Sequence, residues 1–257
     1  MTTNTPRRLE GKTALVTGST RGLGRTIAEW LAREGASIIV SGREADAIEA
    51  SVQAIRALGS EAFGIPADLA NMRDTERLAA EALAYAPALD ILVNNAGMSI
   101  RQSFWDVSPE EFDEQLNVNW RSPFLLNQRI AKNMIDQKVQ GRIVNISTIG
   151  ARACHTDALV YDASKGAVEV MTRNMAFELG PYGIGVNCVA PGNIADRPGS
   201  PHAEWWERGA TKIPLGRIGR ADDIAAAVLF FCLPETSFTT GQTLLVDGAH
   251  DTYLPEF

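Results

Sequence analysis

The sequence is poor in cysteine and has no long apolar run. Only three cysteines occur among 257 residues, Cys154, Cys188 and Cys232. Their spacing matches neither a zinc motif nor a disulfide framework, so no metal site is expected. A sparse, odd set of cysteines favours reduced thiols and therefore a cytoplasmic location.

The sequence also lacks an excess of positive charge. Its formal net charge is −7, and its five lysines are scattered. No basic face for nucleic acid is expected from such a chain. The longest apolar run, at 225–233, is far shorter than the ~18 residues that cross a bilayer. We therefore expect neither a nucleic-acid partner nor a membrane partner.

What the sequence does contain is an alternation of β-rich and helical segments. Strands are expected at 13–17, 37–40, 61–65, 91–94, 142–147, 185–189 and 244–246. Helices are expected at 22–34, 45–58, 73–84, 109–137, 159–179 and 221–233. Apolar strands separated by helices predict a mostly parallel sheet covered on both faces. The expected fold is α/β: a single doubly wound Rossmann-type domain with seven strands, spanning 1–257.

Several short signals refine this prediction. Gly35 and Gly59 follow two expected helices, where left-handed C-terminal caps are common. Ser108 followed by proline is a typical helix start. The segment 193–214 interrupts the alternation with prolines, glycines and adjacent tryptophans. A break after a late strand end predicts a substrate lid at 193–214.

A glycine-rich turn joins the first expected strand to the first helix. Gly18, Gly22 and Gly24 have the spacing Gly-x-x-x-Gly-x-Gly. Glycines let the backbone turn sharply and approach a pyrophosphate, whose charge is stabilised by the helix N-terminus. Taken alone, the loop has a plain strand–helix turn as its alternative interpretation.

Tyr161 and Lys165 lie four residues apart in an expected helix, so their side chains share one face. A free tyrosine titrates near pH ~10, and a neighbouring cation favours its phenolate. Such a pair can exchange protons near neutrality. A Tyr-x-x-x-Lys spacing also arises by chance, so the neighbouring motifs decide whether the pair is catalytic.

Further blocks follow in a fixed order. Asn94-Asn95-Ala96-Gly97 closes the fourth strand, Asn119 lies in the next helix, and Pro191-Gly192 follows the sixth strand. Together with the glycine loop and the Tyr161/Lys165 pair, these blocks resemble the short-chain dehydrogenase/reductase family over about 9–248. The resemblance implies a nicotinamide cofactor and hydride transfer between an alcohol and a carbonyl.

The resemblance also implies a catalytic group of Asn119, Thr148, Tyr161 and Lys165. Tyr161 would exchange the proton, Lys165 would lower its pKa and bind the nicotinamide ribose, and Asn119 would hold a water. Thr148 stands where the family usually has serine, and Ser147 precedes it. Which of these two hydroxyls contacts the substrate is open, but the alternation of side chains along a strand favours Thr148.

Cofactor contacts follow from the same resemblance. The implied residues are Gly18, Ser19, Thr20, Arg21, Gly22, Leu23, Gly24, Arg43, Asp68, Leu69, Asn95, Ala96, Gly97, Tyr161, Lys165, Pro191, Gly192 and Ile194. Gly42 stands where NAD-preferring members usually carry Asp, whereas Arg21 and Arg43 suit a 2′-phosphate. NADP is therefore expected, with NAD as the alternative. Asp68 has a second interpretation, as the cap of the following helix. Asp196 and Ala249 depart from the family pattern.

The expected substrate wall is polar and cationic. Arg101, Arg152, His155 and Trp205 are the candidate substrate residues. They favour a small polar molecule over a steroid or long acyl chain. Around Arg101 and in Pro214-Leu215-Gly216-Arg217 the chain resembles the sugar-acid dehydrogenases of this family, such as gluconate 5-dehydrogenases, which implies a sugar or sugar acid. A solvated surface position is the alternative for each arginine.

Three competing interpretations remain open. They are a nucleotide-binding sensor without turnover, an NAD-dependent dehydrogenase of another small alcohol, and an epimerase or dehydratase. The helices 109–137 and 159–179 resemble those by which family members assemble, so a homo-oligomer, a dimer or tetramer, is expected.

Overall fold

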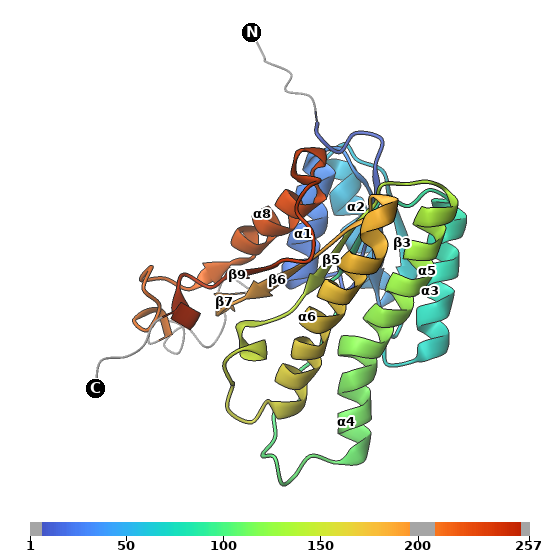
Figure 1. Ribbon diagram of the computed structural model, residues 1–257. Helices are drawn as coiled ribbons and strands as arrows, with labels where there is room; N and C mark the ends of the chain where they lie inside the picture. Colours follow the sequence, from blue (N-terminus) through green and yellow to red (C-terminus); the bar gives the residue numbers. More distant parts are fainter. Residues whose placement is uncertain (1–6, 196–208, 253–257) are drawn as a thin grey trace.

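The computed structural model describes residues 7–195 and 209–252. Seven strands form one sheet in the order β3-β2-β1-β4-β5-β6-β9 (Figure 1). They are β1 (Thr13–Val16), β2 (Ser37–Gly42), β3 (Ala62–Pro66), β4 (Ile91–Asn94), β5 (Arg142–Ile146), β6 (Gly185–Pro191) and β9 (Thr243–Val246). Every pairing in this sheet is parallel. The Rossmann-type α/β prediction is confirmed.

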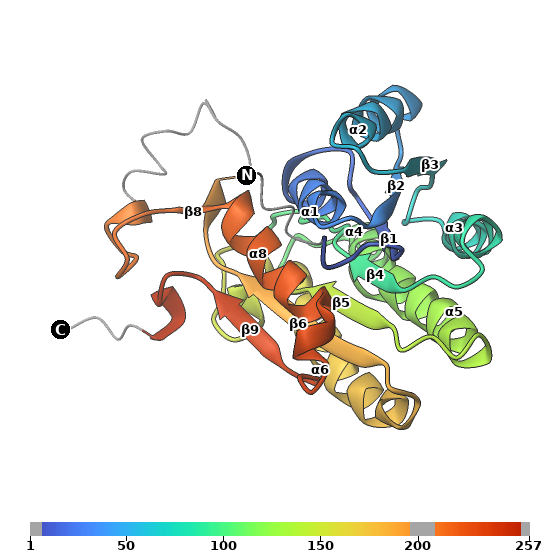
Figure 2. The same cartoon turned by 90° about the horizontal axis from the view of Figure 1, so that it is seen from above.

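Helices cover both faces of the sheet (Figure 2). One face carries α1 (Gly22–Arg33), α2 (Ala45–Ala57) and α8 (Ala221–Cys232). The other carries α3 (Met72–Tyr85), α5 (Ser122–Asp136) and α6 (Leu159–Leu179). Successive strand residues point to opposite cores: Val16 packs with the first group and Leu15 with the second. Burial on both faces explains why the strands read as continuous apolar runs.

The helix expected at 109–137 is divided by a π-helical turn. It consists of α4 (Pro109–Leu116), the π turn Asn117–Arg121 and α5. Pro123 explains the division, because a proline inside a helix has no N–H and crowds the carbonyl four residues earlier. That residue is Asn119. The Ser122 N–H bonds to the Asn117 carbonyl five residues back, as a π turn requires.

The expected helix-end signals are present. Ser108 caps α4, and its side chain accepts from the Glu111 N–H at 3.2 Å while Glu111 accepts from the Ser108 N–H. Gly35 and Gly59 have φ values of 101° and 80°, as left-handed caps after α1 and α2 require. The two glycines place the C-terminal ends of α1 and α2 correctly to within two residues.

The expected lid at 193–214 falls largely outside the described residues, since 196–208, including Asp196 and Trp205, are not described. Its described start forms β7 (Ile194–Ala195), which pairs with β8 (Gly219–Arg220) in a two-stranded sheet that the pattern did not predict. Within 7–195 and 209–252, no helix is long and apolar enough to cross a membrane.

The strand order positions the site. β1 has β2 on one side and β4 on the other, so the chain direction across the sheet reverses between β1 and β4. At such a reversal the loops after the strands diverge and leave a crevice at their carboxyl ends. The glycine loop follows β1 at this edge.

Candidate active site

The glycine loop occupies the carboxyl end of β1. Gly18 and Gly22 have φ values of 63° and 52°, a region that favours glycine. A Cβ atom on Gly24 would overlap the Gly18 carbonyl and the Asn95 side chain. The first turn of α1 has no side-chain cap and no acidic residue. Its N–H groups therefore suit an anion such as a pyrophosphate.

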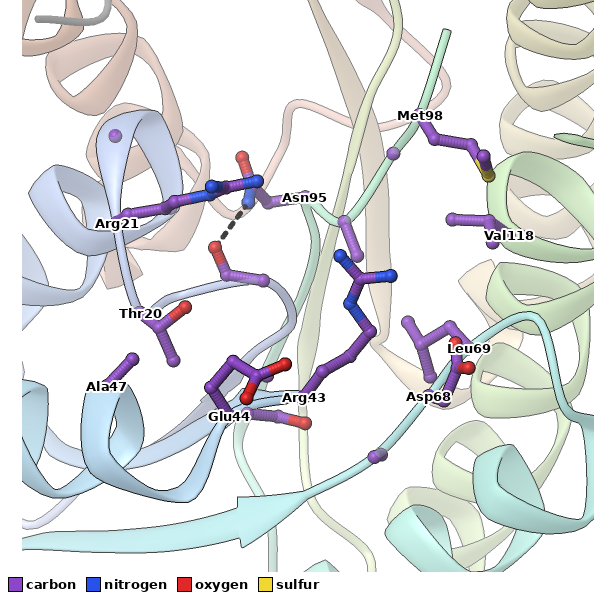
Figure 3. A pocket seen from close by; sticks show the side chains of 18 of the residues that line it. Thr20, Arg21, Arg43, Glu44, Ala47, Asp68, Leu69, Asn95, Met98 and Val118 are labelled. Carbon is purple, nitrogen blue, oxygen red and sulfur yellow. Dashed lines mark hydrogen bonds between the residues drawn. The ribbon is translucent and has the colours of Figure 1, made fainter. Parts of the chain in front are cut away.

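Asn95 fastens this loop to the end of β4. Its Nδ2 donates to the carbonyls of Thr17 at 2.9 Å and Gly18 at 3.3 Å (Figure 3). In return, Thr17 Oγ1 accepts the N–H groups of Asn95 and Ala96, each at 3.0 Å. These reciprocal bonds fix both walls of the crevice, so a ligand finds a preformed site.

The crevice is a cleft of about 580 Å³ (Figure 3). Twelve of the predicted cofactor residues line it: Gly18, Thr20, Arg21, Gly22, Leu23, Gly24, Arg43, Asp68, Leu69, Asn95, Ala96 and Gly97. Its other lining residues are Ser41, Gly42, Glu44, Ala47, Ala67, Met98 and Val118. Most of these additional residues directly follow or precede a predicted one, and that adjacency is the signal that could have found them. The glycine-rich cradle fits a dinucleotide.

Ser19, a predicted cofactor contact, does not line the cleft. It is fully buried, its Oγ donates to the Val16 carbonyl at 2.7 Å, and its N–H donates to the Ser41 carbonyl at 3.0 Å. Both donors are used to join the loop to β2, so Ser19 braces the loop from behind. Pro191, Gly192 and Ile194 lie at the end of β6 and in β7, outside the lining of this cleft.

Two arginines bring positive charge to the cleft. Arg43 extends from the end of β2 into the space between Asn95 and Leu69, and Arg21 lies along the glycine loop (Figure 3). Both are exposed, and neither forms an ion pair within the described part of the chain. Unpaired guanidinium groups suit phosphate oxygens.

The capping interpretation of Asp68 is wrong. Asn71 is the cap of α3, and its side chain accepts from the Arg73 N–H. Asp68 instead accepts from the Ala70 N–H at 3.1 Å and lines the cleft. Its position is therefore compatible with an adenine contact.

Thr148 and Tyr161 form the reacting end of the site. The Thr148 hydroxyl lies on the side of the Tyr161 phenol and lowers the pKa of that group. Ser147 points the other way and bonds the Lys165 carbonyl at 3.2 Å and the Glu169 carboxylate at 3.1 Å. The alternation of side chains along the extended chain thus separates the two hydroxyls. Only Thr148 faces the phenol.

Lys165 lies beneath the tyrosine and is buried. Its Nζ donates to the Ile146 carbonyl at 2.8 Å and lies 5.9 Å from the centre of the Tyr161 ring. Burial lowers the pKa of Lys165 to about 8. A methyl group on Gly97 would lie 3.2 Å from Nζ. Gly97 lines the cleft, so the lysine adjoins it.

The expected lowering of the Tyr161 pKa is not found in this structure. Burial raises the pKa of Tyr161, and the neighbouring Asp162 carboxylate raises it further. The Thr148 hydrogen bond and the Arg101 charge oppose this shift, but they do not outweigh it. Lys165, whose pKa is lowered to about 8, has already lost its proton at the pH where Tyr161 ionises, so it does not offset this rise. Tyr161 is thus a phenol at neutral pH.

Asn119 occupies the π turn and is fully buried. Its Nδ2 donates to the Met98 carbonyl at 2.9 Å and to Ser164 Oγ at 3.1 Å, while its Oδ1 accepts the Met98 N–H at 2.9 Å. Oδ1 also lies next to Gly97, on the same side as Lys165. The π turn therefore ties the β4–α4 loop to α6 beside the lysine.

The candidate substrate residues do not all converge. Arg101 donates to the Thr156 carbonyl at 3.0 Å and acts electrostatically on Tyr161. The Arg152 guanidinium lies 3.5 Å from the buried Glu169 carboxylate. A buried carboxylate needs such a partner, so the charge of Arg152 is already used. His155 is held by Asp162, and Trp205 lies outside the described residues.

A glycine-lined anion cradle on a Rossmann-type sheet, next to a buried Tyr-x-x-x-Lys pair, defines an NAD(P)-dependent oxidoreductase. The described residues contain no cluster that could hold a metal ion. The chain belongs to the short-chain dehydrogenase/reductase family: residues 18–249 match the family described as Enoyl-(Acyl carrier protein) reductase.

Known relatives resemble the chain over almost its whole length. The 3-oxoacyl-(acyl carrier protein) reductase of Aquifex aeolicus is 36% identical, covering 94% of this chain and 98% of the relative. A structure assigned as a gluconate dehydrogenase from Agrobacterium tumefaciens has a TM-score of 0.91 at 30% identity. The match covers 97% of this chain and 99% of the other. A gluconate 5-dehydrogenase from Burkholderia cenocepacia, in complex with NADP and tartrate, has a TM-score of 0.89 at 32% identity, covering 97% and 98%.

Proposed function

We propose that this chain is an NADP-dependent oxidoreductase that interconverts an alcohol and a carbonyl on a small polar substrate, such as a sugar or sugar acid. The observation that carries the proposal is the Thr148–Tyr161–Lys165 group beside Gly97, a residue that lines the cleft. Arg21 and Arg43, which have no ion-pair partner among the described residues, line the same cleft. When bound, the nicotinamide supplies or accepts the hydride.

The chain's own residues handle the proton and the orientation of the substrate. Tyr161 donates its phenolic proton to the carbonyl oxygen during reduction and takes it back during oxidation. Thr148 donates a hydrogen bond to the same oxygen as its charge changes. Lys165 stabilises the phenolate once it has formed, and Asn119 holds the loop and helix that position Lys165.

The choice of NADP rests on the end of β2. Arg43 follows Gly42 there, and Arg21 faces the same space (Figure 3). Gly42 cannot readily be replaced by Asp, because a Cβ atom at this position would lie 2.5 Å from Thr20 Cγ2. The acidic group that would bind the NAD ribose is therefore sterically disfavoured. The Burkholderia neighbour's complex with NADP supports this choice.

The polar substrate class rests on Arg101. It is exposed, it acts on Tyr161 electrostatically, and it has no ion-pair partner among the residues described. A cation close enough to act on Tyr161 favours a substrate with negative charge or several oxygens. The neighbour's complex with tartrate, a dicarboxylate with two hydroxyls, supports the same class.

The test is a turnover panel with NADPH and NADP. It compares sugar-acid and polyol pairs with apolar ketones, in the wild type and in Tyr161→Phe. The proposal expects turnover of polar pairs, a net change in reduced-nicotinamide absorbance, and loss of turnover with unchanged NADPH binding in the variant. Turnover of apolar ketones alone would refute the polar class.

The same panel, repeated with NAD and NADH, separates the competing functions. A sensor would bind NADPH without turnover in the wild type. An epimerase or dehydratase would convert substrate without net absorbance change. An NAD-dependent dehydrogenase would show a higher kcat/KM with NAD than with NADP.

We further propose a homo-oligomer, a dimer or tetramer, in the cytoplasm. Large apolar side chains are exposed on α4, the π turn, α5 and α6: Phe112, Trp120, Phe124, Val170 and Phe177. Monomers rarely expose so many on adjoining helices. Sedimentation of wild type and Phe177→Glu tests this assignment, and a monomeric wild type would refute it.

A further inference from the structure

A histidine–aspartate pair lies beside the Tyr161 phenol, in the loop between β5 and α6. Asp162 Oδ2 accepts the His155 backbone N–H at 2.8 Å, and Oδ1 lies 2.8 Å from the ring nitrogen Nδ1. The Asp162 side chain is buried, so water competes little for these bonds. The imidazole is therefore held in one position.

The pair fits because residue 150 has no side chain. A Cβ atom on Gly150 would overlap both Asp162 Oδ1 and His155 Nδ1. The Gly150 N–H in turn donates to Thr148 Oγ1 at 3.3 Å. One packed turn thus holds both the hydroxyl that contacts Tyr161 and the imidazole.

The bond to Asp162 also fixes the tautomer of the imidazole. A carboxylate only accepts hydrogen bonds, so Nδ1 carries a proton, and whenever the ring is neutral Nε2 is the acceptor. Within the described ranges, Nε2 has no hydrogen-bond partner, and it is not among the buried polar atoms left unsatisfied. Among these residues Nε2 is therefore left to bond a ligand.

The second ring nitrogen lies within reach of the reacting end of the site. The His155 and Tyr161 rings are 6.4 Å apart between centres and tilted by 54°. At this separation one small molecule can contact both rings. We propose that His155, oriented by Asp162, accepts a hydrogen bond from a substrate hydroxyl on the carbon next to the reacting one. The site then prefers vicinal diols and hydroxyketones to isolated alcohols and ketones.

A hydroxyl fits this position better than a carboxylate does. Asp162 already places negative charge here, and its effect is felt at Tyr161. Arg152, a cation of the same loop, is paired with Glu169. A second anion at Nε2 would meet an acceptor and a neighbouring carboxylate, whereas a hydroxyl supplies the missing donor. This inference rests on the proposed oxidoreductase function and narrows its substrate class.

The experiment compares a polyol with its analogue lacking the hydroxyl next to the reacting carbon, in NADP-linked oxidation. The variants are His155→Phe, which removes the acceptor, His155→Gln, which retains one, and Asp162→Asn, which weakens the orientation. Cys154→Ser is the matched control, since Cys154 is exposed on the same loop. NADPH titration and thermal melting establish folding for each variant.

His155→Phe is expected to lower kcat/KM for the polyol about tenfold, mainly through KM, and to leave the deoxy analogue within twofold. For the polyol, the kcat/KM values of His155→Gln and Asp162→Asn should lie between those of wild type and His155→Phe. Equal losses on both substrates would mean that His155 only holds the loop, and an unchanged preference would mean that it faces solvent; either refutes the inference. If wild type uses neither member of the pair, the proposed polar function fails as well. If His155→Phe does not fold, the other two variants decide.

Discussion

The Thr148 hydroxyl acts on Tyr161 and lowers its pKa, whereas the hydroxyl of the preceding Ser147 points to α6 and bonds Glu169. This arrangement shows that the extended chain after β5 directs one hydroxyl into the site and one into the protein. Loss of the Thr148 hydroxyl and loss of the Ser147 hydroxyl should therefore have different consequences for catalysis and stability.

Thr148→Ala should therefore lower kcat by about 100-fold or more, because it removes a donor to the oxygen whose charge changes. Thr148→Ser retains the hydroxyl and should stay near wild type. Ser147→Ala is the matched control: it should lower the melting temperature, since it leaves part of the buried Glu169 unsatisfied, but should largely preserve kcat. Steady-state kinetics and thermal melting of the three variants check this assignment. The opposite order of kcat values would mean that Ser147 contacts the substrate.

The raised pKa of Tyr161 predicts different pH profiles for the two directions. Reduction needs the phenol, which burial keeps protonated through neutral pH, so its kcat/KM should be flat from about pH 6 to 8. Oxidation needs the phenolate, so its kcat/KM should rise about tenfold per pH unit through the same range. Stopped-flow or steady-state rates in both directions test this. An oxidation profile that levels off below pH 7 would contradict the upward direction of the shift.

Much of this arrangement could be predicted from the sequence, because each signal is local. Apolar runs predicted the strands, and Gly18 and Gly24 predicted the cradle after β1. The Tyr161/Lys165 spacing predicted a shared helix face. What the pattern missed depends on contacts between distant segments. Ser19 fits the loop motif, yet only the pairing with β2 shows that it faces backwards.

Two other differences between the sequence-based expectation and the structure also arise from contacts between distant segments. Arg152 looks like a free cation until α6 brings the buried Glu169 to 3.5 Å from it. The direction of the Tyr161 pKa depends on burial, which spacing alone does not reveal. The π turn at Asn119 is an exception. Pro123 was a visible local signal, because its ring crowds the carbonyl of Asn119 four residues earlier.

Burying Lys165 should cost stability at neutral pH. Its pKa is lowered to about 8 from an ordinary value of 10.5, so between these pH values the unfolded chain holds one more proton than the folded chain. Lys165→Met should therefore be more stable than wild type at pH 7, by about 3 kcal/mol or less. This difference should shrink as the pH rises from 8 to 10.5. Denaturant unfolding at pH 7, 9 and 10.5 measures it.

Lys132→Met provides the control for this comparison, because Lys132 is exposed and pairs only with Asp136 on the same helix. Its free energy of unfolding relative to wild type should not change with pH over this window. A constant difference for Lys165→Met as well would mean that the lysine keeps its ordinary pKa when buried.

Cofactor preference should depend on Gly42, Thr20 and Arg43 together. Arg43→Ala should raise the KM for NADPH about 10- to 100-fold and change the KM for NADH little, because it removes a charged partner of the 2′-phosphate. Gly42→Asp alone should impair both cofactors, since its Cβ would lie 2.5 Å from Thr20 Cγ2. Adding Thr20→Gly removes that contact and should let the new carboxylate bind the NADH ribose. Kinetics with both cofactors test the series, with Arg33→Ala, at the far end of α1, as control. If Gly42→Asp alone switches preference to NADH, Thr20 does not restrict this position.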